Sequence, residues 1–236
     1  MASLVTYQLN NGIATISMDD GKANAIGLQM LEELNAALDQ AEADQAVVII
    51  AGRPGMFSAG FDLKVFGGDP ADQLKMLTGG ARLSERLLDF PRPVIAACTG
   101  HAVAMGTFLL MSTDLRISVN EGARFHVNEV QIGMTVPHFA LEVCKQRLSP
   151  AYLHAAAVTA HPYGPAEALT AGFVDAIVPA AELAATVQAQ AERMKGLIAS
   201  SFVATKRRLR KATMAAMATA IEADIADWIA LGKARG

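Results

Sequence analysis

Cysteine is scarce in this sequence, because Cys98 and Cys144 are the only two in 236 residues. Two cysteines cannot form the disulfide framework of a small secreted protein, and their spacing does not match a metal site. The N-terminal residues also lack the basic and apolar regions of a signal peptide. We therefore expect a cytoplasmic protein with two reduced core cysteines and no bound metal.

A large excess of charge of either sign is also absent. The chain carries 20 basic and 23 acidic residues, which gives a formal net charge of −3 and an isoelectric point near 5.9. Such a chain lacks the broad basic surface that nucleic acid binding requires. We expect no nucleic acid partner, and any anionic ligand must be bound by a local group of residues.

One uncharged run, residues 93–113, is long enough to span a bilayer, and hydrophobic residues make up 52% of the chain. However, Gly100 and Gly106 interrupt the run, Thr99 and His101 are polar, and its first residues are typical of a strand. We interpret the run as a buried strand, a loop and a helix, and expect no membrane segment.

The pattern of apolar residues predicts alternating strands and helices. Two alternating strands flank an Asn-Gly turn, and an uninterrupted apolar strand follows a helix that Asn24 can cap. The predicted strands span residues 5–9, 13–18, 46–51, 94–98, 115–119 and 173–178, and further predicted helices span residues 72–89, 152–159, 165–171, 183–198 and 202–228. This alternation is typical of an α/β fold.

Two segments of small residues follow core strands. Residues 57–63 come after the strand at 46–51, and residues 100–107 come after the strand at 94–98. Small residues let the backbone approach a ligand closely, and an N–H group at the start of a helix can stabilise an oxyanion. One such segment is compatible with an ordinary turn, whereas two favour a binding site.

The order and spacing of these motifs resemble the crotonase family, also called the enoyl-CoA hydratase/isomerase superfamily. The resemblance rests on Ala23-Asn24-Ala25-Ile26 and on residues 57–63, 100–114, 125–137 and 164–175. It implies a crotonase-like α/β fold, with a ββα spiral core and acyl-CoA site in residues 1–180 and a helical trimerisation region in residues 181–236. The implied assembly is a homotrimer or a dimer of trimers, with the C-terminal helices between subunits.

The resemblance also implies the positions of the site residues. The backbone N–H groups of Phe61 and Met105 would form an oxyanion hole for the thioester oxygen of an acyl-CoA. The family commonly has glycine where this chain has Ala104 and Met105, so the Met105 side chain must point away from the thioester. The other substrate-binding positions are Ala59, Gly60, Asp62, Leu63, Gly106 and Phe108.

The catalytic carboxylates separate two activities. Family hydratases carry two glutamates that hold a water molecule, and this chain has Phe108 at the first position and Glu129 at the second. By itself Glu129 is compatible with a solvated loop, but the resemblance assigns it as the base. One carboxylate can move a proton from C2 to C4 of a 3-enoyl thioester, which favours a Δ3,Δ2-enoyl-CoA isomerase. An enoyl-CoA hydratase of fatty-acid β-oxidation and a non-catalytic acyl-CoA binder are the alternatives.

The basic cluster near the C-terminus has two interpretations. Lys206 and Arg210 can lie on a solvated helix face, or they can contact the phosphates of coenzyme A. Coenzyme A would enter as part of the substrate, and no separate cofactor is expected. His101, His126 and His138 lack a paired acid or nucleophile in the sequence and are typical of packing or hydrogen-bonding residues.

Overall fold

The chain opens with the predicted hairpin. The computed structural model describes residues 2–235, and β1 (Val5–Asn10) pairs antiparallel with β2 (Ile13–Met18). Asn11 and Gly12 both have positive φ angles, of 48° and 74°. That backbone geometry suits a two-residue turn between twisted strands, which explains the Asn-Gly pair in the sequence.

A six-stranded sheet forms the centre of the molecule. Its order is β1-β2-β4-β7-β9-β11, and every pairing after the hairpin is parallel. The added strands are β4 (Val47–Ala51), β7 (Val94–Cys98), β9 (Leu115–Val119) and β11 (Ala176–Val178). All five residues of β7 are buried, as expected for a central parallel strand covered on both faces.

Two smaller sheets stand beside this one. Strands β10 (Phe125–His126), β8 (Gly100–Val103) and β5 (Gly55–Ser58) form one, while β3 (Ala25–Ile26) and β6 (Gly60–Phe61) form the other. The run 93–113 is thus divided between β7, β8 and a short buried helix, as the interrupted pattern predicted. None of the described helices has the length and apolar character needed to cross a membrane.

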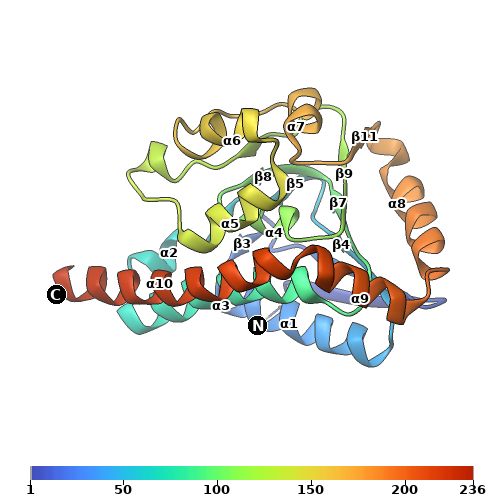
Figure 1. Cartoon of the computed structure of the whole chain (residues 1–236), viewed down its shortest axis with the longest axis horizontal. Helices are drawn as coiled ribbons and strands as arrows, with labels where there is room; N and C mark the ends of the chain where they lie inside the picture. Colours follow the sequence, from blue (N-terminus) through green and yellow to red (C-terminus); the bar gives the residue numbers. More distant parts are fainter. Residues whose placement is uncertain (1, 236) are drawn as a thin grey trace.

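Helices surround the sheets on several sides (Figure 1). They are α1 (Leu28–Ala43), α2 (Leu63–Phe66), α3 (Pro70–Asp89), α4 (Met105–Met111), α5 (His138–Arg147), α6 (Pro150–Ala157), α7 (Pro165–Ala171), α8 (Ala180–Lys195), α9 (Ala199–Leu209) and α10 (Lys211–Arg235), with a short 3-10 helix at Val130–Ile132. The predicted helix at 202–228 is divided between α9 and α10, because the helical conformation is interrupted at Arg210.

Asn24 does not cap α1, so that prediction is wrong. The N-cap residue is Gly27, while Asn24 is fully buried with a positive φ of 49°. Its side-chain amide donates to the carbonyls of Met18 and Phe57, at 2.9 and 3.2 Å. Asn24 therefore ties the end of β2 to β5 and helps to fix the segment that leads into β6.

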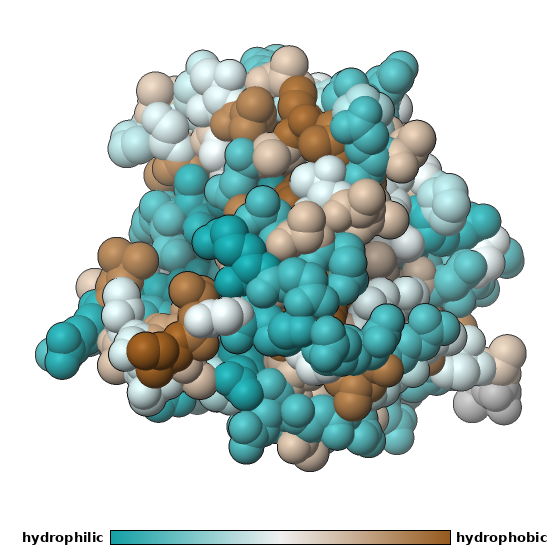
Figure 2. All heavy atoms as spheres, turned by 90° about the vertical axis from the view of Figure 1, so that its right-hand side faces the viewer, coloured by the Kyte–Doolittle hydropathy of each residue, from teal (hydrophilic) through white to brown (hydrophobic). Residues whose placement is uncertain are grey.

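The C-terminal helices complete the same core. Helix α8 packs against β4, β7 and β9, and α10 packs against α3 and α5. Buried residues of α8 and α10 belong to one cluster with those of the sheet, so a division at residue 180 does not separate two cores. The face that carries α8 is largely hydrophilic, with hydrophobic side chains in small separate groups (Figure 2). Much of the high apolar content is accordingly buried within the chain.

Candidate active site

The first small-residue segment turns one backbone N–H group away from its partner strand. The N–H of Asp62 donates to the carbonyl of Ile26 at 3.2 Å, across the β3–β6 pair. Because successive N–H groups on a strand point to opposite sides, the N–H of Phe61 points away from β3. The Ser58 hydroxyl stabilises this segment, because it donates to the carbonyl of Asn24 and accepts from the N–H of Gly60.

In the second segment, the strained backbone of Ala104 positions the N–H group of Met105. Ala104 is the N-cap of α4, with φ 49° and ψ −126°, a conformation that glycine adopts more easily than alanine. Three backbone hydrogen bonds fix it: its N–H donates to His126, and its carbonyl accepts from Thr107 and Phe108. Met105 is then the first residue of α4, where an N–H has no partner within the helix.

The two segments lie against each other. A Cβ atom built on Gly60 would lie 3.2 Å from the Met105 nitrogen and 2.9 Å from the Ala104 methyl carbon. Gly60 itself has φ 97°, so both its conformation and its surroundings require glycine. The strands therefore bring the Phe61 and Met105 backbones to one place.

Helix α3 fixes the side chains of these two residues. A Cβ built on Gly80 would lie 2.5 Å from the Phe61 ring and 3.3 Å from Met105 Cε. The buried Met105 side chain thus points toward α3, as the resemblance requires. A mid-helix glycine normally costs about 1 kcal/mol relative to alanine, and the close packing of Phe61 explains its presence here.

We expect Gly80→Ala to destabilise the protein by about 1–3 kcal/mol despite the better helix propensity, because the new methyl group overlaps the Phe61 ring. Displacing Phe61 should also lower kcat. Gly79→Ala is the matched control, since its nearest neighbour is the flexible Leu31 side chain at 3.0 Å. Thermal unfolding and turnover of both variants check this. Equal effects of the two substitutions would contradict the packing role of Gly80.

These elements border a cavity of about 750 Å³, a volume typical of small-molecule sites. The lining comes from β6, α2, α3, α4, the 125–137 segment, α5 and α10. The lining includes Ala59, Phe61, Ala104, Phe108, Asn128 and Glu129, together with Leu74, Leu77, Val136, Trp228 and Leu231. The lining is mainly apolar, which suits an acyl chain.

Glu129 lies in this apolar surrounding. The residue is only 6% exposed, and its Oε2 atom has no hydrogen-bond partner among the described residues. Burial raises the pKa of Glu129 from its ordinary value to about 7, because a carboxylate loses the solvation that its charge needs. Phe108 lines the same cavity and packs edge-on against Phe139, with ring centroids 5.9 Å apart. A carboxylate whose pKa lies near neutral pH is suited to accept and return a proton.

The family follows from a comparison with known proteins. A family model described as enoyl-CoA hydratase/isomerase matches residues 8–231. The chain belongs to the enoyl-CoA hydratase/isomerase family. The crotonase-like fold is confirmed as well, because solved structures of this family superpose on nearly the whole chain.

Three members of the family illustrate the similarity. Human mitochondrial enoyl-CoA delta isomerase 1 is 28% identical over 96% of this chain and 76% of its own length. A structure of an enoyl-CoA isomerase from Mycobacterium tuberculosis is 41% identical, covers 98% of this chain and 99% of its own, and has a TM-score of 0.90. An enoyl-CoA hydratase structure from Mycobacterium marinum is also 41% identical, covers 95% and 99%, and has a TM-score of 0.92. Both names, isomerase and hydratase, are thus given to equally similar members of the enoyl-CoA hydratase/isomerase family, and a second structure of the Mycobacterium tuberculosis protein is described as a probable enoyl-CoA hydratase.

Some residues predicted to bind substrate line the cavity and others support it. Ala59, Leu63 and Phe108 are in the lining. Asp62 instead caps α2 by accepting from the N–H of Lys64 at 3.0 Å. Gly106 packs on Ser58 so closely that any side chain would overlap the Ser58 carbonyl. Its role in this family member is therefore to let α4 approach β5.

The histidines divide in a similar way. His126 is buried, and its Nε2 atom lies 2.8 Å from the carbonyl of Ala160, consistent with the predicted hydrogen-bonding role. His138 lines the cavity, with Nε2 3.4 Å from Asp227 on α10. His101 is half-buried on β8, outside the cavity lining.

The structure corrects the proposed phosphate contacts of Lys206 and Arg210. Both residues are buried, and their side chains lie 2.9 and 3.1 Å from the two carboxylate oxygens of Asp114. Lys206 also donates to the carbonyls of Leu87 and Phe90. These cations hold α9 against the end of α3 and the loop before β9, so they are not available to a coenzyme A phosphate.

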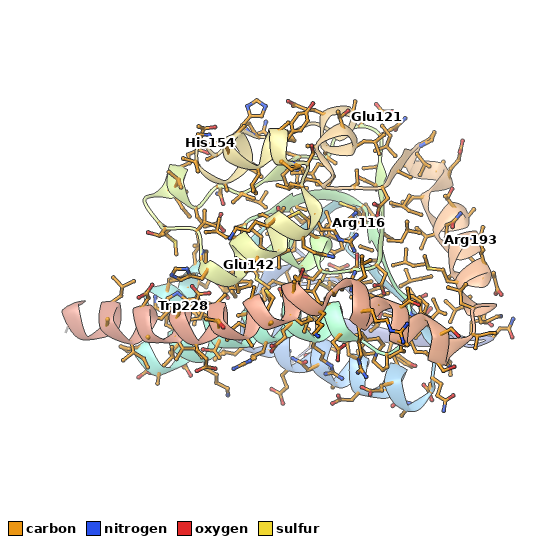
Figure 3. The ribbon with its side chains drawn as sticks, viewed as in Figure 1. Arg116, Glu121, Glu142, His154, Arg193 and Trp228 are labelled. Carbon is orange, nitrogen blue, oxygen red and sulfur yellow. The ribbon has the colours of Figure 1, made fainter. Side chains whose placement is uncertain are left out.

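Two further residues at the cavity carried no signal in the sequence. Asp224 on α10 is 2% exposed, and its carboxylate accepts the N–H groups of His138 and Phe139, each at 2.8 Å. It therefore caps α5 and fixes α10 beside it. Trp228 lies one turn later, where α10 passes the start of α5 (Figure 3). Helix α10 thus forms part of the wall of this cavity.

Proposed function

We propose that this protein is a Δ3,Δ2-enoyl-CoA isomerase in which Glu129 is the catalytic base. The observation that supports this most strongly is the state of Glu129. Among the cavity-lining carboxylates of the described residues, it combines burial with an oxygen that has no hydrogen-bond partner. Asp224 also lines the cavity, but both of its oxygens accept backbone N–H groups.

The proposed reaction moves one proton. The Glu129 carboxylate takes a proton from C2 of a 3-enoyl thioester, and the electrons of that C–H bond form an enolate. The N–H groups of Phe61 and Met105 stabilise the negative oxygen, an effect of about 3 kcal/mol for one such donor. Glu129 then returns the proton to C4, which leaves the double bond between C2 and C3.

Phe108 supports isomerisation over hydration. A hydratase of this family would carry a second carboxylate at that position to help hold a water molecule. Phe108 is 1% exposed and presents an aromatic ring to the cavity. Its apolar surface favours the protonated form of Glu129 and so contributes to a base that can both take and release a proton near neutral pH.

An enoyl-CoA hydratase is the second candidate function, and the similarity to the Mycobacterium marinum structure described as an enoyl-CoA hydratase favours it. A non-catalytic acyl-CoA binder is less well supported, because it would have no use for a buried, unpaired carboxylate beside the thioester site. Substrate for either enzyme would be an acyl-CoA, with coenzyme A as part of the substrate.

The pH dependence of the reaction reports on Glu129. Because its pKa is raised to about 7, the carboxylate is mainly protonated below that pH and mainly ionised above it. We expect kcat/KM for a 3-enoyl-CoA to rise with pH through about 7 and then level off. A pH–rate profile measured from pH 5 to pH 9 checks this. A flat profile across that range would contradict a base of this pKa.

Formation of a 2-enoyl-CoA from a 3-enoyl-CoA tests the proposed function. The wild-type protein is incubated with the 3-enoyl thioester, and the products are identified by proton NMR. We expect the conjugated 2-enoyl thioester to appear first, before any hydroxylated product. No double-bond migration by the folded protein would overturn the proposal.

A further inference from the structure

Ser58 lies between the two backbone segments of the site and packs against both. It is fully buried at the end of β5. Its hydroxyl accepts the N–H of Gly60, the residue before the Phe61 donor, at 3.2 Å. On the other side, a Cβ atom built on Gly106, the residue after the Met105 donor, would lie 2.8 Å from the Ser58 Cβ atom. One buried side chain therefore lies against a neighbour of each proposed donor.

The hydrogen that Ser58 donates fixes the direction of its hydroxyl. The acceptor is the carbonyl of Asn24, at 2.7 Å. Asn24 is itself held in place, because its side-chain amide donates to the carbonyls of Met18 and Phe57. A hydroxyl has one hydrogen to donate and two lone pairs that accept. Once the hydrogen is directed at Asn24, a lone pair of the Ser58 oxygen is left to accept the N–H of Gly60.

Gly60 transmits this constraint to the Phe61 donor. Strand β6 is only two residues long, and its partner β3 is equally short, so strand pairing alone gives this segment little rigidity. Gly60 also has φ 97° and lacks the side chain that restricts the backbone of other residues. Ser58 holds the peptide group before Gly60, and the two Gly60 dihedral angles then set the peptide group that carries the Phe61 N–H.

We infer that Ser58 is a positioning residue of this enzyme, whose hydroxyl keeps the Phe61 N–H aimed at the same point as the Met105 N–H. The inference rests on the proposed function, because that point is where the thioester oxygen would lie. Ser58 is outside the cavity lining, so it acts on the substrate only through the backbone. Its effect should be largest in the transition state, where negative charge develops on the oxygen.

The kinetic test replaces Ser58 by alanine, which removes the acceptor of the Gly60 N–H. The kcat of isomerisation should fall about tenfold. This is less than the 10² to 10³ typical of a deleted oxyanion donor, because the Phe61 N–H is still present and only misdirected. KM should stay within about twofold of the wild type. Ser118→Ala should change neither quantity. It is the matched control, since Ser118 is also fully buried and donates to a backbone carbonyl, but lies on β9 outside the cavity lining.

A spectroscopic test separates positioning from a general loss of structure. The probe is octanoyl-CoA with an isotopic label on the thioester carbon, and infrared difference spectroscopy measures its C=O stretching frequency when bound. Hydrogen bonds to the thioester oxygen lower this frequency, so the wild type and Ser118→Ala should show the same downward shift. In Ser58→Ala the shift should be about half as large, because one of the two donors is misdirected.

Ser58→Cys is a second variant that keeps a polar atom at this position. A thiol is a weak donor and a weak acceptor, so its kcat and frequency shift should lie between those of the wild type and Ser58→Ala. An unchanged frequency shift in either folded Ser58 variant, an equal effect of Ser118→Ala, or a loss confined to KM would each overturn the inference. A wild type with a Ser58-dependent shift but no double-bond migration would instead refute the proposed function and leave the positioning role standing.

Discussion

Glu129→Gln is expected to lower the kcat of double-bond migration by about 10² to 10⁴, the usual contribution of a positioned general base. Glutamine keeps the shape of the side chain but cannot accept the C2 proton. Substrate affinity should change little, because the substitution leaves the proposed backbone donors at Phe61 and Met105 and the apolar walls of the cavity untouched. Steady-state kinetics with a 3-enoyl-CoA, together with calorimetric binding of a saturated acyl-CoA, measure both quantities.

A matched control is Glu167→Gln, which alters an exposed glutamate paired with His161. It should leave kcat and affinity unchanged. A Glu129→Gln variant that keeps full isomerase activity would show that the base lies elsewhere, and His138, which lines the same cavity, would be the next residue to replace. A loss confined to KM would instead assign Glu129 to binding.

Asp114→Ala is expected to destabilise the fold by about 3–5 kcal/mol, because it leaves the buried cations of Lys206 and Arg210 without their counterion. Burial already lowers the pKa of Lys206 to about 8. The substitution also removes the acceptor of the Val94 N–H, which bonds to Asp114 Oδ2 at 2.9 Å. For a chain of this length the loss corresponds to a fall of roughly 10 °C in Tm.

Asp89→Ala is the control for this prediction. Asp89 pairs with Arg207 in two short hydrogen bonds, but both side chains are largely exposed. Exposed ion pairs contribute about 0–1 kcal/mol, so this variant should unfold close to the wild type. Chemical denaturation of both variants gives the comparison. Similar midpoints for the two would contradict the counterion role of Asp114.

The large sheet could be predicted from the sequence because its strands carry a continuous local signal. Strands such as β4 and β7 are uninterrupted apolar runs, and the β1–β2 hairpin contains its own turn signal. In contrast, β3, β6 and β10 are two residues long. Two residues are too short for any periodic pattern, so these strands depend on neighbours that are distant in the sequence.

Helix α5 was missed by the sequence-based prediction, and the reason is related. Its N-cap residue is Pro137, which offers no capping side chain. The cap comes from Asp224, 86 residues from His138, so the start signal of this helix is tertiary. The predicted homotrimer likewise stays a prediction, since it concerns contacts with other copies of the chain.

The site residues show the same division between local and tertiary information. Glu129, Phe61 and Met105 could be proposed because their motifs resemble those of the family. The burial of Lys206 and Arg210 could not, because a basic run on a helix usually faces water. These two residues are four positions apart and so share one helix face, and that face turns toward Asp114.

The most direct test of the central claim is the ratio of two rates in the wild-type protein. A 3-enoyl-CoA and a 2-enoyl-CoA of the same chain length are supplied separately, and kcat/KM is measured for isomerisation of the first and hydration of the second. With Glu129 as the base and Phe108 in place of a second carboxylate, isomerisation should be the faster reaction. Hydration faster than isomerisation would contradict the account and make this family member a hydratase.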